Sequence, residues 1–281
     1  DIMNGFFNVY KSSNTNSTFI VNKIKHLVGQ PCGHMGTLDP MASGVLPVAV
    51  GKSTRLFDYF ADKKKTYIAK FKFGYETDTL DKTGKTVKIC DKIPDKSEIE
   101  RALPNFLGQI SQVPPKYCAN SVNGRRGYDL ARKGIDFELK AKTVTVYSFK
   151  LLDGENGEYR FEIECGKGTY IRSLARDLGY ACSSLATMTE LERTKSGAFS
   201  ITSAVTLDEL AKNPEKYLIR PDETLDYEKV FLTEEQTKKM LNGVFEIKIE
   251  QGLYRVYSPT EFLGIGKSED GLLKIKAYVR C

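Results

Sequence analysis

The stretch GHMGTLDPMASGVLP, at residues 33–47, decides how the chain folds around one acidic side chain. Its glycines permit tight backbone turns, and Pro40 restricts Asp39 to an extended conformation. The stretch therefore presents a single carboxylate on a stiff loop, with the imidazole of His34 five residues earlier. An Asp-Pro turn in an arbitrary sequence most often holds a solvated acid. The neighbouring segments must therefore decide whether Asp39 has a function.

The sequence around this stretch predicts a protein of mixed α and β structure. Residues 30–51 are rich in glycine and proline, which indicates a long loop interrupted by the apolar run VLPVAV. Alternating apolar residues predict strands, and apolar residues at helical spacing with capping signals predict helices. The expected strands are 5–11 and 65–74, with 143–152 and 158–165 joined by an Asn-Gly turn. The expected helices run from Ser17 to Gly29, from a Ser97–Glu100 capping box to near Gly108, over 128–133, from Ile171 to Gly179 and over 206–212.

The end of the chain differs from the rest in composition and charge. Residues 213–229 are polar and contain proline, which is typical of a linker. Residues 230–281 hold short alternating segments with glycine turns, which favours a small β-barrel-like module. Residues 221–281 carry 9 Lys and Arg against 11 Asp and Glu, whereas residues 1–220 carry 33 against 25. The basic body favours a polyanionic partner such as RNA or DNA.

The sequence lacks the patterns of several other classes of protein. Its six cysteines are scattered without a C-x-x-C pair, and it has two histidines, His26 and His34. A zinc site and a Ser-His-Asp triad are therefore not expected. It has no P-loop or dinucleotide fingerprint, no apolar run of about 18 residues and no signal-peptide pattern. We expect a cytoplasmic protein without metal or cofactor, whose chemistry uses carboxylates, Tyr, Lys and Arg.

Segments along the chain match one known family in order and spacing. GHMGTLDPMASGVLPVAVGKSTR (33–55) closely resembles the signature of the TruB family of tRNA pseudouridine synthases, which isomerise a uridine in the T arm of tRNA. The other matching segments are KTYIA (65–69), TDTLD (77–81) with Gly84, PPKYCA (114–119) with GRR (124–126) and Tyr128, CGKGTYIRSL (165–174) and LERT (191–194). The resemblance spans about residues 5–212.

The resemblance implies an α+β fold with a central mixed, largely antiparallel sheet and flanking helices, the pseudouridine synthase fold, followed by a small β-rich, PUA-like module. It implies a catalytic domain over residues 1–222, then a linker and RNA-binding module over 223–281. It also implies a monomer that modifies position 55 in the T arm of tRNA without metal, cofactor or membrane. Two positions depart from the family pattern. Residues 11–14 (KSSN) stand where the family has Lys-Pro-x-Gly, and Ser121 stands near a family Lys.

Three residues match the family's catalytic positions. Asp39 matches its nucleophilic acid, and covalent catalysis divides one hard step into two easier ones. Arg172 matches the residue that pairs with this acid, and a planar guanidinium suits bidentate pairing with a carboxylate. Tyr67 matches a residue whose ring can stack on the target uracil and whose phenol can transfer a proton. Asp39 could attack the sugar, attack the base or act through elimination, and each path uses the same carboxylate.

The remaining matches concern substrate binding. Tyr170 and Leu191 match positions that line the base pocket, and His34 matches a residue that fills the space left when the target uridine is flipped out. Without the resemblance, Tyr67 and Leu191 would be interpreted as core residues and His34 as a loop hydrogen-bonding residue. Phosphate contacts are expected from basic side chains near these segments. The candidates are Lys63, Lys64, Lys65, Lys116, Arg125, Arg126, Arg132 and Lys133.

Two alternative functions remain open at this point. One is a pseudouridine synthase that acts on another RNA. The other is a tRNA-binding or tRNA-folding chaperone without catalytic activity, against which the intact motif around Asp39 argues.

Overall fold

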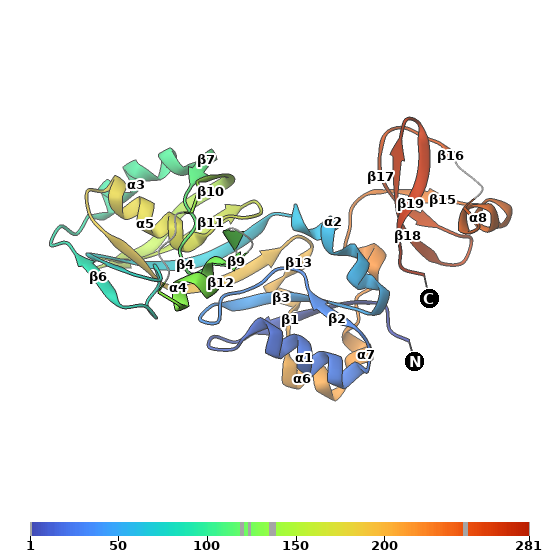
Figure 1. Cartoon of the computed structure of the whole chain (residues 1–281), viewed down its shortest axis with the longest axis horizontal. Coiled ribbons are helices and arrows are strands. Elements are labelled where there is room, and N and C mark those ends of the chain that lie inside the picture. Colours follow the sequence, from blue (N-terminus) through green and yellow to red (C-terminus); the bar gives the residue numbers. More distant parts are fainter. Residues whose placement is uncertain (1, 119–120, 123–124, 135–138, 244–246, 281) are drawn as a thin grey trace.

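The computed structural model describes residues 2–118, 121–122, 125–134, 139–243 and 247–280, and Figure 1 shows two separate sheets. In this described part, the larger sheet has ten strands in the order β14-β1-β3-β12-β4-β11-β10-β7, with β2 beside β3 and β13 beside β12. The strands are β1 (Gly5–Lys11), β2 (Cys32–His34), β3 (Ser43–Val50), β4 (Lys65–Phe73), β7 (Gly108–Gln112), β10 (Lys142–Glu155), β11 (Glu158–Cys165), β12 (Ala186–Ser196), β13 (Phe199–Ser200) and β14 (Val205–Thr206). The β1–β14 and β3–β12 pairs are parallel and the other pairs are antiparallel. The expected mixed, largely antiparallel sheet is therefore confirmed.

Helices and two small hairpins surround this sheet (Figure 1). The helices are α1 (Ser17–Val28), α2 (Phe57–Ala61), α3 (Lys96–Ala102), α4 (Gly127–Arg132), α5 (Ile171–Ala181), α6 (Leu207–Lys212) and α7 (Pro214–Tyr217). The hairpins pair β5 (Tyr75–Thr77) with β6 (Thr86–Ile89) and β8 (Ser121–Val122) with β9 (Arg125–Arg126). No helix in the described residues is long and apolar enough to cross a membrane.

The main core lies on one face of the sheet. Ile24 of α1 and Leu174 of α5 pack into the same buried cluster as Phe7 of β1 and Phe71 of β4. Phe6 points to the other face, because successive side chains of a strand alternate, and packs there against Phe60 and Phe199. The sheet is thus covered on both faces where the N-terminal strand crosses it.

A short parallel pairing joins the two halves of the sheet. Gly44 of β3 lies opposite Arg193 of β12, and Ser43 lies opposite Glu192. A Cβ atom at Gly44 would lie 2.2 Å from the carbonyl oxygen of Arg193, and the backbone of Gly44 has a φ of +110°. Glycine is required here because any side chain would collide with β12. The junction places the loop before β3 directly against β12.

The second sheet is formed by the C-terminal residues. Its order is β15-β17-β18-β19-β16. The elements are β15 (Glu228–Phe231), α8 (Glu234–Leu241), β16 (Ile247–Lys248), β17 (Gly252–Tyr257), β18 (Phe262–Glu269) and β19 (Leu272–Tyr278). Ile265 and Ala277 share a buried cluster with Leu56 and Phe60 of the larger domain. The expected β-rich C-terminal module is confirmed.

Several sequence expectations hold and others need correction. The strands near 5–11 and 65–74 and the hairpin across Asn156-Gly157 form as expected. Residues 30–51 were expected as a long loop interrupted by an apolar run, but Cys32–His34 and Ser43–Val50 are strands. The side chains of β3 are buried on both faces of the sheet, and β2 pairs with β3. The loop that carries Asp39 is therefore limited to residues 35–42. Residues 213–229, expected as a linker, contain α7, and Ile219 exchanges backbone hydrogen bonds with Phe6.

The helix boundaries also differ. Asn16, not Ser17, caps α1, and the capping box of α3 is formed by Asp95 and Glu98 in place of Ser97 and Glu100. The helix α5 continues past Gly179, which was expected to end it. A Cβ atom at Gly179 would lie 2.5 Å from the backbone nitrogen of Ala186, so this glycine permits close packing and not a helix stop.

The elements that the sequence patterns did not predict include β12 and α8. The strand β12 alternates only in part, because Thr187 and Thr189 are buried polar residues. The sequence of α8 does contain a helix-start pattern, because Thr233 and Gln236 form a capping box.

Candidate active site

The loop between β2 and β3 holds Asp39 in place through backbone contacts. Leu38 accepts a hydrogen bond from the Ser17 hydroxyl at 3.0 Å, and its N–H donates to the same oxygen at 3.2 Å. The amine of Lys11 donates to the carbonyl oxygens of Pro40 and Ala42 at 3.2 and 2.5 Å. Because buried polar groups are expensive to leave unpaired, these contacts fix the backbone on both sides of Asp39.

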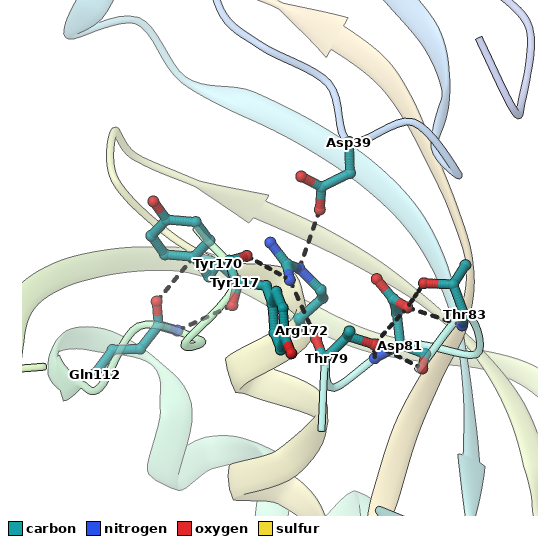
Figure 2. Close-up of polar contacts among 8 residues, drawn as sticks. All are labelled: Asp39, Thr79, Asp81, Thr83, Gln112, Tyr117, Tyr170 and Arg172. Carbon is teal, nitrogen blue, oxygen red and sulfur yellow. Dashed lines mark hydrogen bonds and ion pairs between the residues drawn. The ribbon is translucent and has the colours of Figure 1, made fainter. Parts of the chain in front are cut away.

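Arg172 reaches Asp39 from the first turn of α5. Its Nε atom lies 3.0 Å from Oδ2 of Asp39, and its side chain is 6% exposed while that of Asp39 is 37% exposed. Its Nη1 atom donates to the carbonyl oxygens of Thr79 and Tyr117 at 3.1 and 3.0 Å (Figure 2). The expected partnership is present, but the expected bidentate hydrogen bonding is not, because no hydrogen bond joins Nε, the nitrogen that contacts Asp39, to the carboxylate. The contact is an ion pair without hydrogen-bond geometry at Nε.

A tight turn supplies one of these carbonyls. The buried carboxylate of Asp81 accepts hydrogen bonds from the Thr79 hydroxyl at 2.9 Å and from the hydroxyl and N–H of Thr83 at 2.6 and 2.9 Å. Figure 2 shows this turn beside Arg172. Asp81 therefore orders the backbone that holds the guanidinium.

Tyr170 lies beside the ion pair and is held by its backbone. The buried Gln112 side chain accepts from the Tyr170 N–H at 2.8 Å and donates to the Tyr170 carbonyl at 3.2 Å. Burial, and then the neighbouring Cys118, raise the pKa of Tyr170 to about 12. Its phenol stays protonated at neutral pH, which suits a wall of a binding site.

Tyr67 and Leu191 lie on neighbouring strands. Leu191 is paired with Ala69, and Arg193 is paired with Tyr67, so all four side chains point to one face of the sheet. Tyr67 is 8% exposed and belongs to the main core. Burial raises the pKa of Tyr67, and the positive charge of Arg193 opposes this effect. The tyrosine is thus a core residue that lies opposite Arg193, near the Asp39 loop.

His34 ends β2, five residues before Asp39. Burial, and then the positive charge of Arg193, lower the pKa of His34, so the imidazole is neutral at pH 7. Its buried Nδ1 atom has no hydrogen-bond partner within the described parts of the chain. A neutral ring on a strand next to the Asp39 loop can contact an uncharged part of an organic substrate.

The basic candidates are placed differently from one another. Lys64 is 58% exposed and lies over the Tyr147 ring, 3.8 Å from a Glu164 oxygen. Burial lowers the pKa of Lys65, whose amine donates to the Lys63 carbonyl. Lys116, Arg132 and Lys133 are exposed. The side chains of Arg125 and Arg126 lie outside the described part, although their backbone forms β9.

A cavity of about 890 Å³ opens next to these groups. Its lining includes Leu80, Lys116, Tyr117 and Arg176, so it adjoins the backbone that binds Arg172. Its size falls in the range of ligand-binding cavities. Within the described residues no group of three His, Cys, Asp or Glu side chains could hold a metal ion.

Sequence reasoning missed several residues that build this site. Thr79, Asp81 and Arg193 stood inside matching segments without an assigned role, and Lys11 stood in the departing segment. Ser17 and Gln112 carried no signal, because their partners are backbone groups 21 and 58 residues away. Together these residues hold a carboxylate against a buried guanidinium beside aromatic rings, which suits nucleophilic or acid–base chemistry on an organic substrate.

Comparisons with known proteins agree with this geometry. Residues 25–171 match the family model described as TruB family pseudouridylate synthase (N terminal domain), and residues 172–233 match tRNA pseudouridylate synthase B C-terminal domain. The chain is 40% identical to tRNA pseudouridine synthase B of Clostridium kluyveri, over 99% of this chain and 100% of that protein. It is 42% identical to tRNA pseudouridine synthase B of Clostridium novyi, over 98% and 99%.

The fold has solved relatives as well. A chain in the structure of an H/ACA ribonucleoprotein bound to a substrate RNA containing 2′-deoxyuridine superposes with a TM-score of 0.75 and 22% identity. The superposition covers 99% of this chain and 85% of that chain, and it establishes a shared fold. With family models that match most of its length, this chain belongs to the TruB family of pseudouridylate synthases.

Proposed function

We propose that this protein isomerises uridine to pseudouridine in tRNA, at position 55 of the T arm, with Asp39 as nucleophile. The observation that carries the proposal is the Asp39 carboxylate 3.0 Å from the buried guanidinium of Arg172. The guanidinium at this distance attracts the carboxylate and holds it at one place in the site. The names of the relatives, tRNA pseudouridine synthase B, support tRNA as the substrate.

The reaction breaks the bond between C1′ and N1, turns the base and forms a bond between C1′ and C5. The hydrogen on C5 is lost as a proton and N1 gains one, so that the conversion is redox-neutral and consumes no cofactor. Asp39 supplies the nucleophile, and Arg172 keeps its carboxylate in position. Tyr67 and Leu191 provide an apolar face for the uracil, and Tyr170 closes the site beside the ion pair. Excluding water protects the detached base.

The target uridine must leave the folded T arm to reach Asp39, at a cost of a few kcal/mol. His34 lies on the strand that leads into the Asp39 loop, which supports a role in filling the space that the uridine leaves. Lys64, Lys116 and Arg132 are proposed to hold phosphates around the cleft, together with Lys65, Arg125 and Arg126.

We further propose a catalytic domain over residues 1–222 and an RNA-binding module over 223–281, which is supported by the second sheet starting with β15 at Glu228. The proposal includes a monomer that acts in the cytoplasm.

The test is an assay of pseudouridine formation in a T-arm transcript. The wild-type protein converts the uridine at position 55, whereas Asp39→Asn, which keeps the size of the side chain, loses activity by roughly 10⁴-fold or more. A transcript with cytidine at that position stays unmodified. Activity in Asp39→Asn would show that Asp39 is not the nucleophile. If neither protein forms pseudouridine in the transcript or in total RNA, the result favours a tRNA-binding or tRNA-folding chaperone without catalytic activity.

A further inference from the structure

Arg193 is the largest of the fully buried side chains in the described part of the chain, with 1% of its surface exposed. It lies at the junction where β12 meets β3, directly opposite Gly44. Burying a guanidinium costs free energy unless its donors are satisfied. Its partners therefore indicate what this residue does.

The hydrogen bonds of Arg193 bracket the Asp39 loop. Its Nε atom donates to the carbonyl oxygen of Val45 at 2.9 Å, and its Nη2 atom donates to the carbonyl oxygen of Gly36 at 3.0 Å. Gly36 lies three residues before Asp39 and Val45 lies six residues after it. One rigid guanidinium fork therefore holds both ends of the segment that carries the nucleophile.

The same side chain faces Tyr67. Arg193 and Tyr67 are directly paired on the antiparallel strands β12 and β4. Side chains opposite each other on such strands lie on the same face, with Cβ atoms about 5 Å apart. Arg193 thus lies between the Asp39 loop and the tyrosine ring.

The acceptors of these hydrogen bonds are neutral carbonyl groups, so the positive charge of Arg193 acts on its surroundings. It opposes the burial that raises the pKa of Tyr67, and it adds to the burial that lowers the pKa of His34. The buried guanidinium of Arg193 therefore acts on three parts of the site, which are the Asp39 loop, Tyr67 on β4 and His34 on β2.

We propose that Arg193 is a positioning residue for the isomerisation, which holds the Asp39 loop and the Tyr67 phenol in one fixed arrangement. The proposal rests on the proposed function of the site. Arg193 acts on the reaction through Asp39 and Tyr67 and does not itself contact the substrate. A mispositioned nucleophile about 1 Å from its productive place can cost 10²-fold in rate.

The experiment compares Arg193→Lys in the wild-type protein and in Tyr67→Phe. Lysine keeps the charge but cannot hold the two carbonyls and the phenol together. We expect Arg193→Lys to lower kcat by roughly 10- to 100-fold and to leave the Kd for tRNA within about threefold. In the Tyr67→Phe background, Arg193→Lys is expected to lower kcat by a factor at least about five times smaller than in the wild type, because the effects of coupled residues are not additive. An equal loss in both backgrounds, or no loss in either, would overturn the proposal.

Arg255→Lys is the matched control. Arg255 lies on β17 of the C-terminal sheet, and it also donates to two backbone carbonyls, those of Tyr227 and Asp222. At saturating tRNA, where a change in RNA affinity does not affect the rate, its replacement is expected to leave kcat unchanged. A comparable fall in kcat would show that losing any such arginine damages the protein, and would contradict a specific role for Arg193.

A second measurement covers the case in which Arg193→Lys does not fold. The Nε–H resonance of Arg193 is compared by NMR between the wild-type protein and Tyr67→Phe, which loses one oxygen atom. The proposal expects a changed chemical shift, and an unchanged resonance contradicts it. Wild-type activity on the T-arm transcript separates the two proposals. An inactive wild type defeats the proposed function, whereas an active wild type with a fully active Arg193→Lys defeats this inference alone.

Discussion

The Nε atom of Arg172 lies 3.0 Å from Oδ2 of Asp39, while Nη1 of the same guanidinium is occupied by the carbonyl oxygens of Thr79 and Tyr117. The arginine is therefore anchored by the backbone through Nη1 and contacts the carboxylate through Nε. A guanidinium held by two backbone carbonyls has a defined place beside Asp39.

Arg172→Lys tests this anchoring. Lysine keeps the charge but leaves at least one of the two carbonyls unpaired, which destabilises the fold by about 1–3 kcal/mol. We expect kcat on the T-arm transcript to fall by roughly 10²-fold, because the nucleophile loses its fixed partner. Arg160→Lys is the control, since Arg160 pairs with Asp153 on the surface and such pairs contribute about 0–1 kcal/mol. Near-wild-type turnover of Arg172→Lys would show that charge alone suffices.

Ser17→Ala tests the clamp on the other side of the loop. The Ser17 hydroxyl both donates to and accepts from the backbone of Leu38, next to Asp39. Its loss leaves two buried backbone groups without partners, so we expect a decrease of about 1–3 kcal/mol in the free energy of unfolding and a lower kcat. Chemical denaturation and the transcript assay measure the two effects. Thr18→Ala, at an exposed neighbouring position, is expected to change stability by less than about 0.5 kcal/mol. If Ser17→Ala behaves like Thr18→Ala, the clamp has no energetic role.

Some contacts of the site can be predicted from the sequence, and others cannot, because their partners are backbone groups. The sequence predicts the pairing of Asp39 with Arg172, because whole segments around them match one family. Gln112, Ser17 and Lys11 escaped prediction because they bind backbone carbonyls and N–H groups, which every residue carries. No residue type marks such a partner in the sequence. The geometry of the Asp39–Arg172 contact is unpredictable for the same reason, since the backbone carbonyls of Thr79 and Tyr117 that bind Nη1 help to set the orientation of the guanidinium.

The elements of the fold likewise differ in how far they can be predicted from the sequence. Local patterns predicted β4 and the hairpin of β10 and β11, where alternation and the Asn-Gly turn act over a few residues. The residues of β2 and β3 look like a loop because Gly33, Gly44 and Pro47 are poor strand formers. The strand β3 forms through pairing with β1 and β12, which are distant in the sequence, and β2 forms through pairing with β3.

Lys11 gives the protein a pH dependence that can be measured. Burial, opposed by the negative charge of Asp39, lowers the pKa of Lys11 from 10.5 to about 8. Between these two values the unfolded chain binds a proton at this amine that the folded chain does not, so stability rises with pH in that window. We expect the free energy of unfolding of the wild type, relative to Lys11→Met, to increase from pH 8 to 10 by up to about 1.4 kcal/mol per pH unit. Titrations shared by both proteins cancel in this difference. A difference that stays constant or falls would contradict a lowered pKa.

The affinity for tRNA is expected to fall steeply with salt, because basic side chains that neutralise phosphates release counterions. Lys64 is 58% exposed, and its ion pair with Glu164 is long, at 3.8 Å, so a phosphate can compete with Glu164 for the amine. Lys64→Gln is expected to weaken binding for all tRNA sequences and to reduce the slope of log K against log salt by about 1. Lys23→Gln, on the exposed face of α1, leaves the slope unchanged. Filter binding at several salt concentrations measures both slopes. A wild-type affinity that stays flat from low to moderate salt would contradict a phosphate-binding surface, and equal slopes for the two variants would remove Lys64 from it.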